Sequence, residues 1–150
     1  MAIFLLKKSY QASNQKEIGF KDLWGSHGVF TTIRLLGKPG KLILFKSHFK
    51  GLIKSLKKYK IYSKNIETNI NRLIYSNINK NINYDHLFRI ALTKKFISIS
   101  IRKRLKPKKN FELKLINYRR IDPKTKNLYY KKILKELNKC DPSKTDIALI

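Results

Sequence analysis

The sequence predicts an α+β fold: a small N-terminal domain with an antiparallel sheet and two helices, followed by the start of a second α/β domain. Runs of β-branched and aromatic residues, closed by glycine and proline, predict strands. Between these runs lies a stretch whose apolar residues recur at helical intervals. We therefore divide the chain into residues 1–118, the small α+β domain, and residues 119–150, a linker and the beginning of a larger domain.

The first strands are expected near the N-terminus. Residues 3–6 are apolar and favour a short strand, and the polar stretch up to Asp22 is expected to be a loop. Gly28–Leu36 (GVFTTIRLL) is rich in β-branched and aromatic residues and predicts a strand. The following GKPG supplies a turn, so Lys41–Phe45 is expected to be the antiparallel partner in a hairpin.

Two helices are predicted next. From Ser47 the apolar residues recur every three or four positions with lysines mostly between them, which predicts a helix over His48–Tyr59 with Ser47 as its N-cap. Residues 65–80 repeat this spacing and predict a second amphipathic helix. Its many asparagines make it a weak helix former.

The second half of the small domain is expected to be β-rich. His86–Thr93, Phe96–Arg102 and Phe111–Tyr118 predict three strands, and the second of them alternates strictly between apolar and polar residues. Leu128–Leu137 then predicts a helix, and the final TDIALI reads as a strand.

Charge is the most prominent feature of the composition. The 150 residues include 28 lysines and 7 arginines against 9 acidic residues, a formal net charge of +26. Such a field attracts any polyanion. Lysine, however, lacks the forked guanidinium that makes bidentate contacts with phosphates and base edges. Isoleucine and asparagine are enriched together with lysine, as an A+T-rich coding sequence would produce. We expect nucleic acid to bind only non-specifically, through charge.

The cysteine, histidine and hydropathy patterns indicate the cellular compartment and bear on metal and membrane binding. Cys140 is the single cysteine, so no internal disulfide is expected, which fits a reducing compartment. The three histidines have no partner at metal-ligand spacing, so no metal site is predicted. No apolar run approaches the roughly 20 residues of a membrane span. These features predict a cytoplasmic protein without a membrane partner.

Three short segments carry a pattern that points to chemistry. They are Gly28–Arg34 (GVFTTIR), His48–Leu56 (HFKGLIKSL), and Lys124–Asn127 (KTKN) followed by a helix and TDIALI. In this order they resemble motifs of the class IV (fold-type IV) aminotransferases, which depend on pyridoxal 5'-phosphate. The corresponding family patterns are V/L-F-E/T-T-I/L-R after a glycine, H-x-x-R-L-x-x-S, and K-x-x-N leading to A-D-E-A-L. The family includes branched-chain and D-amino-acid aminotransferases and aminodeoxychorismate lyase.

The resemblance implies a role for one lysine. Lys124 would form the Schiff base with the aldehyde of pyridoxal 5'-phosphate, with Lys126, Arg119 and Arg120 helping to lower the pKa of its amine. The residue type suits this chemistry, because an amine with a lowered pKa attacks an aldehyde at neutral pH. The cofactor then delocalises the carbanion. Without the flanking pattern, any one of the 28 lysines is a solvated surface charge.

Further site residues follow from the same resemblance. Arg34 and Arg89 lie on predicted strands and would bind the carboxylate of the substrate, an amino acid or an aminochorismate. A structural ion pair, or an edge arginine facing solvent, is the alternative for both. Thr31 and Thr32 are closer to the lyase branch, and His48 is expected to pack or cap. The family implies a homodimer for the complete protein.

The chain departs from the family pattern at two places. Gly51 stands where the family has the arginine that contacts the cofactor phosphate, and the neighbouring Lys50 is displaced by about 100° on a helix. WGSHG replaces the usual Y-G-D-G. Family members also continue well beyond TDIALI, whose apolar residues read as the beginning of a buried strand. We therefore expect an N-terminal fragment with low activity.

Two other hypotheses stay open. The first is a basic RNA-binding or ribosome-associated protein that uses the lysine-rich loop Leu105–Asn110. It predicts binding that discriminates among RNAs at physiological salt. The second is a non-functional gene remnant, which the apolar end of the chain and Gly51 favour.

Overall fold

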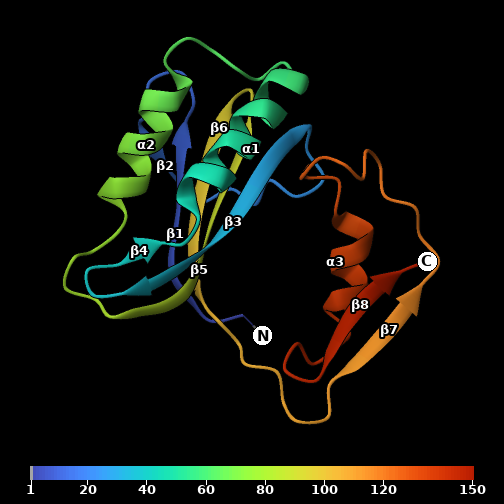
Figure 1. The fold of residues 1–150 in the computed structure, drawn as a ribbon. Helices are drawn as coiled ribbons and strands as arrows, with labels where there is room; N and C mark the ends of the chain where they lie inside the picture. The colour runs from blue at the N-terminus through green and yellow to red at the C-terminus, as the bar shows by residue number, and fades with distance from the viewer. Residues whose placement is uncertain (1) are drawn as a thin grey trace.

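The computed structural model describes residues 2–150, and a six-stranded antiparallel sheet forms most of it (Figure 1). The strand order is β2-β1-β6-β5-β3-β4. The strands are β1 (Phe4–Gln11), β2 (Glu17–Ile18), β3 (Gly28–Gly37), β4 (Lys41–Leu42), β5 (Tyr84–Thr93) and β6 (Phe96–Lys103). All neighbouring pairs in this sheet are antiparallel.

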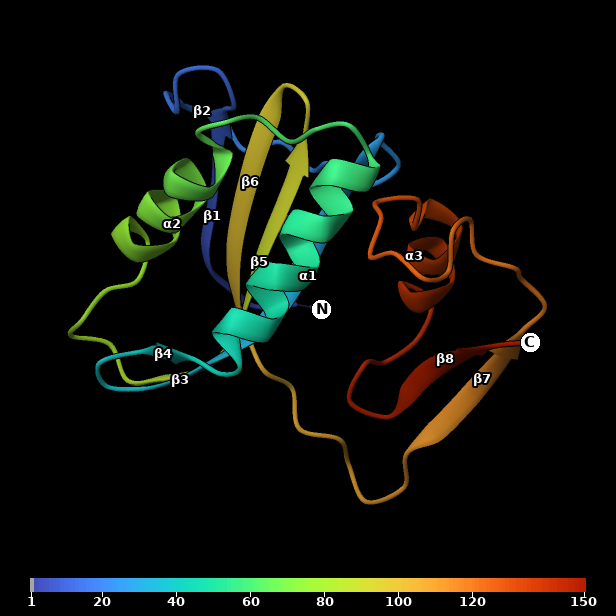
Figure 2. The same cartoon turned by 45° about the horizontal axis from the view of Figure 1, so that its top comes forward.

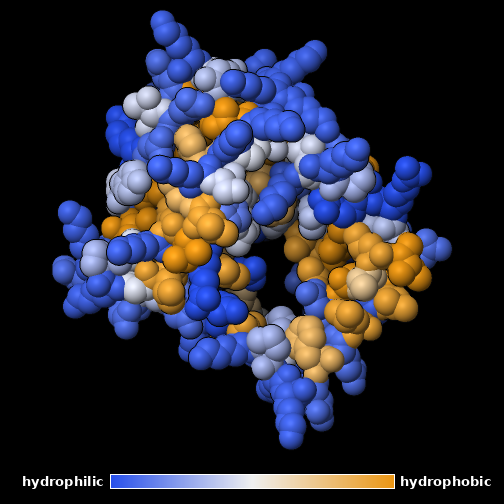
Figure 3. Space-filling model, in the orientation of Figure 1, coloured by the Kyte–Doolittle hydropathy of each residue, from blue (hydrophilic) through white to orange (hydrophobic). Residues whose placement is uncertain are grey.

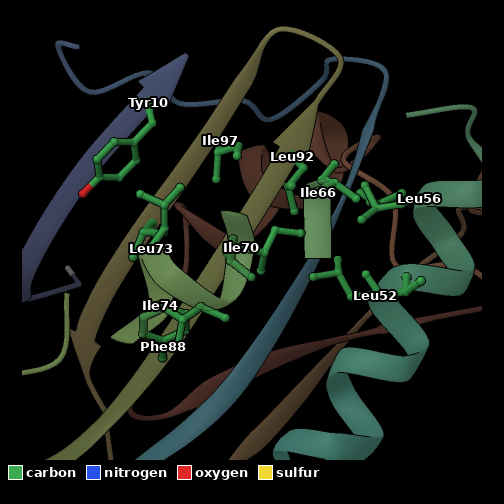
Figure 4. Packing of buried hydrophobic residues seen from close by; sticks show 14 of the residues in the cluster. Tyr10, Leu52, Leu56, Ile66, Ile70, Leu73, Ile74, Phe88, Leu92 and Ile97 are labelled. Carbon is green, nitrogen blue, oxygen red and sulfur yellow. The ribbon is translucent and has the colours of Figure 1, made fainter. Parts of the chain in front are cut away.

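Two helices cover one face of this sheet and form the main core with it. Helix α1 (Phe45–Lys58) contributes the buried Leu52 and Leu56. Helix α2 (Ile66–Ser76) contributes four buried apolar side chains. Figure 4 shows these side chains over one face of the sheet, with Ile74 of α2 beside Phe88 of β5, which is fully buried. Apolar residues at helical spacing on both helices thus bury one stripe each against the sheet, which stabilises helices that propensity alone would leave marginal.

Alternation along the central strands separates the two faces of the sheet. In β3, Val29, Ile33 and Leu35 are buried, whereas Arg34 between the last two is exposed. Ile33 pairs with Phe88 across the β3–β5 ladder, so the buried sets of both strands share one face. The opposite face carries the arginines of these strands.

The C-terminal residues form a smaller unit of strand, helix and strand (Figure 2). Strand β7 (Glu112–Ile116) pairs in parallel with β8 (Thr145–Leu149). Helix α3 (Lys131–Leu137) lies between them in sequence and packs on one face of the pair, where Lys114 reaches Glu136. Figure 3 shows that apolar residues remain on the surface of this unit. The antiparallel sheet with two helices, followed by this parallel unit, confirms the predicted α+β class.

The N-terminal expectation was wrong in part. Strand β1 continues to Gln11, and the polar stretch after it contains β2. The strand persists because it forms a long ladder with β6, in which Ser9 and Tyr10 are buried. Ser9 also shares a 2.7 Å hydrogen bond with Ser98, so the polar side chains satisfy each other inside the sheet.

The start of the first helix also differs from the prediction. The strand after the GKPG turn covers only Lys41–Leu42, and the helix begins at Phe45, before the expected N-cap Ser47. Leu44 is the N-cap residue and adopts a left-handed conformation with φ of 54°. No side chain caps this helix, so its first residue could not be predicted from the residue types that usually cap helices.

Two later elements are shorter than predicted, and one belongs to another sheet. Helix α2 ends at Ser76 rather than near residue 80, and α3 starts at Lys131 rather than Leu128. Strand β7 pairs with β8 and not with the large sheet, so the two sheets divide the chain between β6 and β7. The division after residue 118 therefore stays a prediction about domains, while the sheets separate earlier.

Candidate functional site

A cleft of ≈ 660 Å³ lies between α1 and the segment that precedes α3. One wall is built by α1, with Ser47, His48, Gly51, Leu52, Lys54, Ser55 and Lys58. The other wall is Lys124–Lys126, and Phe30 and Thr31 of β3 complete it. All three sequence segments of the aminotransferase pattern therefore line one cleft, although they are far apart along the chain.

Backbone hydrogen bonds hold the Lys124 segment against β3. The Phe30 N–H donates to the Lys126 carbonyl at 2.9 Å, and the Leu128 N–H donates to the Gly28 carbonyl at 3.0 Å. Val29 and Asn127 form an isolated antiparallel bridge between these contacts. The segment is therefore fixed by main-chain atoms, and the side chains of Lys124 and Lys126 stay free to project into the cleft.

Two motif residues are required for the contact between the Lys124 segment and β3. A Cβ added at Gly28 would collide with the Leu92 carbonyl oxygen and lie 2.7 Å from Leu128 Cδ1, so only glycine allows the close approach. Asn127 is 1% exposed, and its Nδ2 donates to the carbonyls of Ile121 and Asp122 at 2.7 and 3.2 Å. These residues shape the turn that presents Lys124.

A polar cluster ties the same turn to the end of α1. The Lys58 Nζ lies 2.7 Å from both carboxylate oxygens of Asp122 and 3.0 Å from the Thr125 hydroxyl. Tyr59 also donates its hydroxyl to Asp122 at 3.0 Å. Hydrogen bonding to Lys58 and Thr125 holds the pKa of the Asp122 carboxyl below its ordinary value of 3.8. Burial and the bond to Asp122 raise the pKa of Tyr59. We call Lys58, Tyr59, Asp122 and Thr125 the latch cluster.

His48 contacts β3 from within the cleft. Its Nδ1 lies 3.3 Å from the Thr31 hydroxyl, which is buried. Partial burial and the nearby positive charge of Lys126 lower the pKa of His48 below 6.5. The imidazole is therefore mainly neutral at pH 7, and it lines the same cleft as Lys124.

The predicted lysine lies at the cleft, with its side chain exposed. Lys124 lines the cleft with Gly51, the position of the family arginine, whereas Lys50 does not line it. An added Cβ at Gly51 meets nothing within 4 Å, so the space there is open. Arg120 donates to the Thr125 carbonyl at 3.2 Å and stacks over Tyr130, so it supports the turn through the backbone.

Sequence reasoning did not single out Lys54, Lys58 or Asp122. Lys54 and Lys58 follow Gly51 by three and seven positions, the spacing of one helix face, which was available as a signal once Gly51 was noted. Asp122 had no such signal, because it reaches Lys58 only through the fold.

Arg34 and Arg89 lie outside the cleft, on the sheet face that the helices do not cover. Arg34 is 3.5 Å from Asp85, and both side chains are about half exposed. The Arg89 guanidinium lies 4.6 Å from the Trp24 ring centroid, and burial lowers its pKa while Asp22 opposes the shift. Their contact with a substrate carboxylate stays a prediction.

The other sequence features lie away from this cleft or form no centre. Among residues 2–150, no group of three or more histidine, cysteine or acidic side chains is placed to hold a metal ion. None of the described helices has the length and apolar character needed to cross a bilayer. The basic loop Leu105–Asn110 is exposed between the two sheets, and Lys108 in it lies 3.9 Å from Asp141.

Comparison with known proteins adds only a weak likeness to solved structures. No family model and no curated protein matches the chain. Among solved structures, a hypothetical aminotransferase from Mycobacterium tuberculosis, in its apo form, is similar at 12% identity and a TM-score of 0.48. The match covers 97% of this chain and 62% of that one, so the chain spans less than two thirds of its neighbour. Similarity at this level assigns no function, and the chemistry must be argued from the cleft.

Proposed function

We propose that this chain is a class IV aminotransferase-like protein that binds pyridoxal 5'-phosphate in the cleft between α1 and Lys124–Lys126. One observation carries the proposal: Gly28–Arg34, His48–Leu56 and Lys124–Asn127, the three segments that resemble the family, all contribute to the walls of this cleft. Colinear motifs that merely occurred by chance would have no reason to converge in space.

The cleft fits the cofactor in size and charge. Its volume of ≈ 660 Å³ lies within the range of small-molecule sites, about 300–1,000 Å³. Four lysines line it, and none of its lining residues is acidic, which suits a phosphorylated ligand. The space above Gly51 adds room on the α1 wall.

Different residues of the cleft would have different roles in binding the ligand. Lys124 would attach the aldehyde through its ε-amine, and the latch cluster would keep the turn that carries Lys124 close to α1. Neutral His48, held by Thr31, would present an uncharged ring beside the ligand. When bound, the cofactor supplies the electron sink for chemistry at the α-carbon of an amino acid.

The reaction class under this proposal is amino-acid transamination or aminodeoxychorismate lysis. The substrate would be an amino acid or an aminochorismate, handled by a homodimeric cytoplasmic protein. Arg34 and Arg89 remain the proposed carboxylate contacts, and their position on the far sheet face means that they would meet a substrate only in a larger assembly or a longer chain.

Selective labelling of Lys124 tests the cofactor proposal. The protein is incubated with substoichiometric pyridoxal 5'-phosphate, reduced with borohydride and mapped by peptide mass spectrometry. We expect Lys124 to be labelled well ahead of the other 27 lysines, and Lys124→Ala to remove the visible absorption band. Lys50→Ala is the matched control, because it removes an exposed lysine of α1 that does not line the cleft and should keep the label on Lys124.

Labelling spread evenly over the lysines would overturn this proposal. So would a Lys124→Ala variant that forms the coloured adduct as readily as the parent protein. Circular dichroism of both variants controls for folding, which neither exposed side chain is expected to affect.

A second candidate, RNA binding, is favoured by the exposure of the basic loop Leu105–Asn110. It is tested by measuring affinities for several RNAs across a salt series. Binding that falls equally for every RNA and for a non-nucleic polyanion as salt rises reduces this candidate to bulk charge.

A further inference from the structure

One face of α1 forms a stripe along the cleft that lacks bulky side chains. Ser47, Gly51 and Ser55 are spaced by four residues, and Lys58 follows three residues later, so they lie on one helix face. Lys54 projects from the border of this stripe into the same cleft. The stripe therefore offers open space at Gly51 flanked by cationic side chains.

The lysines of the cleft differ in whether they already have a partner. Lys58 is committed to Asp122 in the latch cluster. For Lys54, Lys124 and Lys126, no ion pair is found within the part of the chain that the structure describes. Their charges are thus available to a ligand. Burial and, after it, the positive charge of Lys126 lower the pKa of His48 in the same cleft.

The hydroxyl groups of the stripe do not supply the charge that an anion needs. Ser55 donates its proton to the Gly51 carbonyl at 3.0 Å, as a helical serine often does. A phosphate in this space must therefore be bound mainly by ammonium groups, each of which carries three donors.

We propose that Lys54 and Lys126, one from each wall, bind the phosphate group of the ligand in the open space beside Gly51. They take over the contact that an arginine at position 51 makes in the resembled family. The identity of the ligand as pyridoxal 5'-phosphate rests on the proposed function, but the phosphate subsite rests on the geometry of these lysines. Lys54 also borders a groove of ≈ 550 Å³ between α1 and α2, which Lys50 lines as well. That arrangement makes Lys50 the matched control.

The experiment titrates isotope-labelled protein with inorganic phosphate at constant ionic strength and follows backbone amides by NMR. We expect amides of residues 51–55 and 124–126 to shift together. Lys54→Ala and Lys126→Ala should each weaken phosphate binding about fivefold, because each removes a charge-assisted contact. Lys50→Ala removes the same charge from the same helix and should change the affinity less than about twofold.

Each outcome decides the proposal. An equal loss in all three variants would mean that bulk charge attracts phosphate, and shifts scattered over the surface would mean the same, so either overturns it. Well-dispersed spectra of all variants show that folding is intact, as expected for exposed side chains.

A gain-of-binding variant and a second probe separate this inference from the cofactor proposal. Gly51→Arg places the family side chain in open space and should tighten phosphate binding about fivefold. Pyridoxal, which lacks the phosphate, should label Lys124 equally in the parent protein and in Lys54→Ala. Local phosphate binding together with unselective labelling by pyridoxal 5'-phosphate would keep the subsite and overturn only the cofactor proposal.

Discussion

The six-stranded sheet with α1 and α2 differs from the C-terminal unit in how much apolar surface it buries. In the first region, fully buried side chains from both helices and the central strands form one cluster. In the C-terminal unit Ile133 is the buried apolar residue of α3, and Leu113 and Leu115 of β7 are each 63% exposed. The first region has its own core, whereas the second leaves an apolar sheet face open.

The candidate site lies where the two regions meet. Leu128, 1% exposed, packs with Leu23 and Ala91, while Trp24 and Phe30 lie beside them. The Trp24 and Phe30 rings are 4.9 Å apart in an edge-to-face arrangement. Lys124 is therefore positioned by contacts with the well-packed region, and the exposed face of β7 contributes nothing to its placement.

The largest effect is expected from a substitution in the core of the packed region. Phe88→Ala should lower the free energy of unfolding by about 3–5 kcal/mol, because Phe88 is fully buried at the centre of the main core. Urea unfolding monitored by circular dichroism measures it. Leu113→Ala, in the exposed face of β7, is the paired variant and should change stability by about 0.5 kcal/mol or less. Similar losses in both variants would show that β7 is covered in solution.

A smaller effect is expected where the regions join. Leu128→Ala should cost about 2 kcal/mol or more, because it leaves a cavity between Leu23 and Ala91. Hydrogen exchange should quicken at the Phe30 and Leu128 amides, which carry the docking hydrogen bonds. Protection of the β6 amides should fall much less. Uniform loss of protection would indicate that the two regions unfold as one unit.

The sequence predicted the elements of the packed region well because burial and periodicity coincide there. The alternation in β6 and the apolar spacing of both helices each mark one buried face. Residues 128–130 show the limit: their apolar character suggested helix, but Leu128 docks at the start of β3 through backbone bonds with Gly28 and Gly25. No local pattern encodes a pairing partner a hundred positions away.

Only part of the candidate site was predictable from the sequence. The resemblance located Lys124 and Gly51, and the structure brings both to one cleft. It did not reveal the latch cluster, since Lys58 is one of 28 lysines and its pairing with Asp122 arises only from folding. A motif thus predicts candidate residues, whereas chain-specific contacts require the three-dimensional arrangement.

The latch cluster offers a sharper test of how the turn is held. Asp122→Asn should lower Tm at pH 7, because Lys58 and Tyr59 lose a carboxylate partner. The folded pKa of Asp122 lies below 3.8, so its stabilisation is present above that value and is lost as pH falls through the folded pKa. The variant should therefore show a flatter decline of Tm in acid.

Asp85→Asn is the matched control for this change. Asp85 is also paired, with Arg34 at 3.5 Å, but its side chain is 46% exposed on the far face of the sheet, against 24% for Asp122. It should leave both Tm and its acid dependence close to those of the parent. An Asp122→Asn variant that behaves in the same way would show that the latch cluster does not hold the turn.

The smallest expected effect concerns the charge inside the cleft and is measured as the pKa of the His48 ring. Burial and Lys126 lower the pKa of His48 below 6.5, so the unfolded chain takes up this proton before the folded one. Stability is therefore lost as pH falls from about 6.5 through the lowered folded pKa. Lys126→Ala should raise the pKa of His48 in an NMR titration of its ring protons and reduce that loss. Because burial is the larger cause, the pKa should stay below 6.5 in this variant. A His48 titration that Lys126→Ala leaves unchanged would show that the charge of Lys126 does not act on the imidazole.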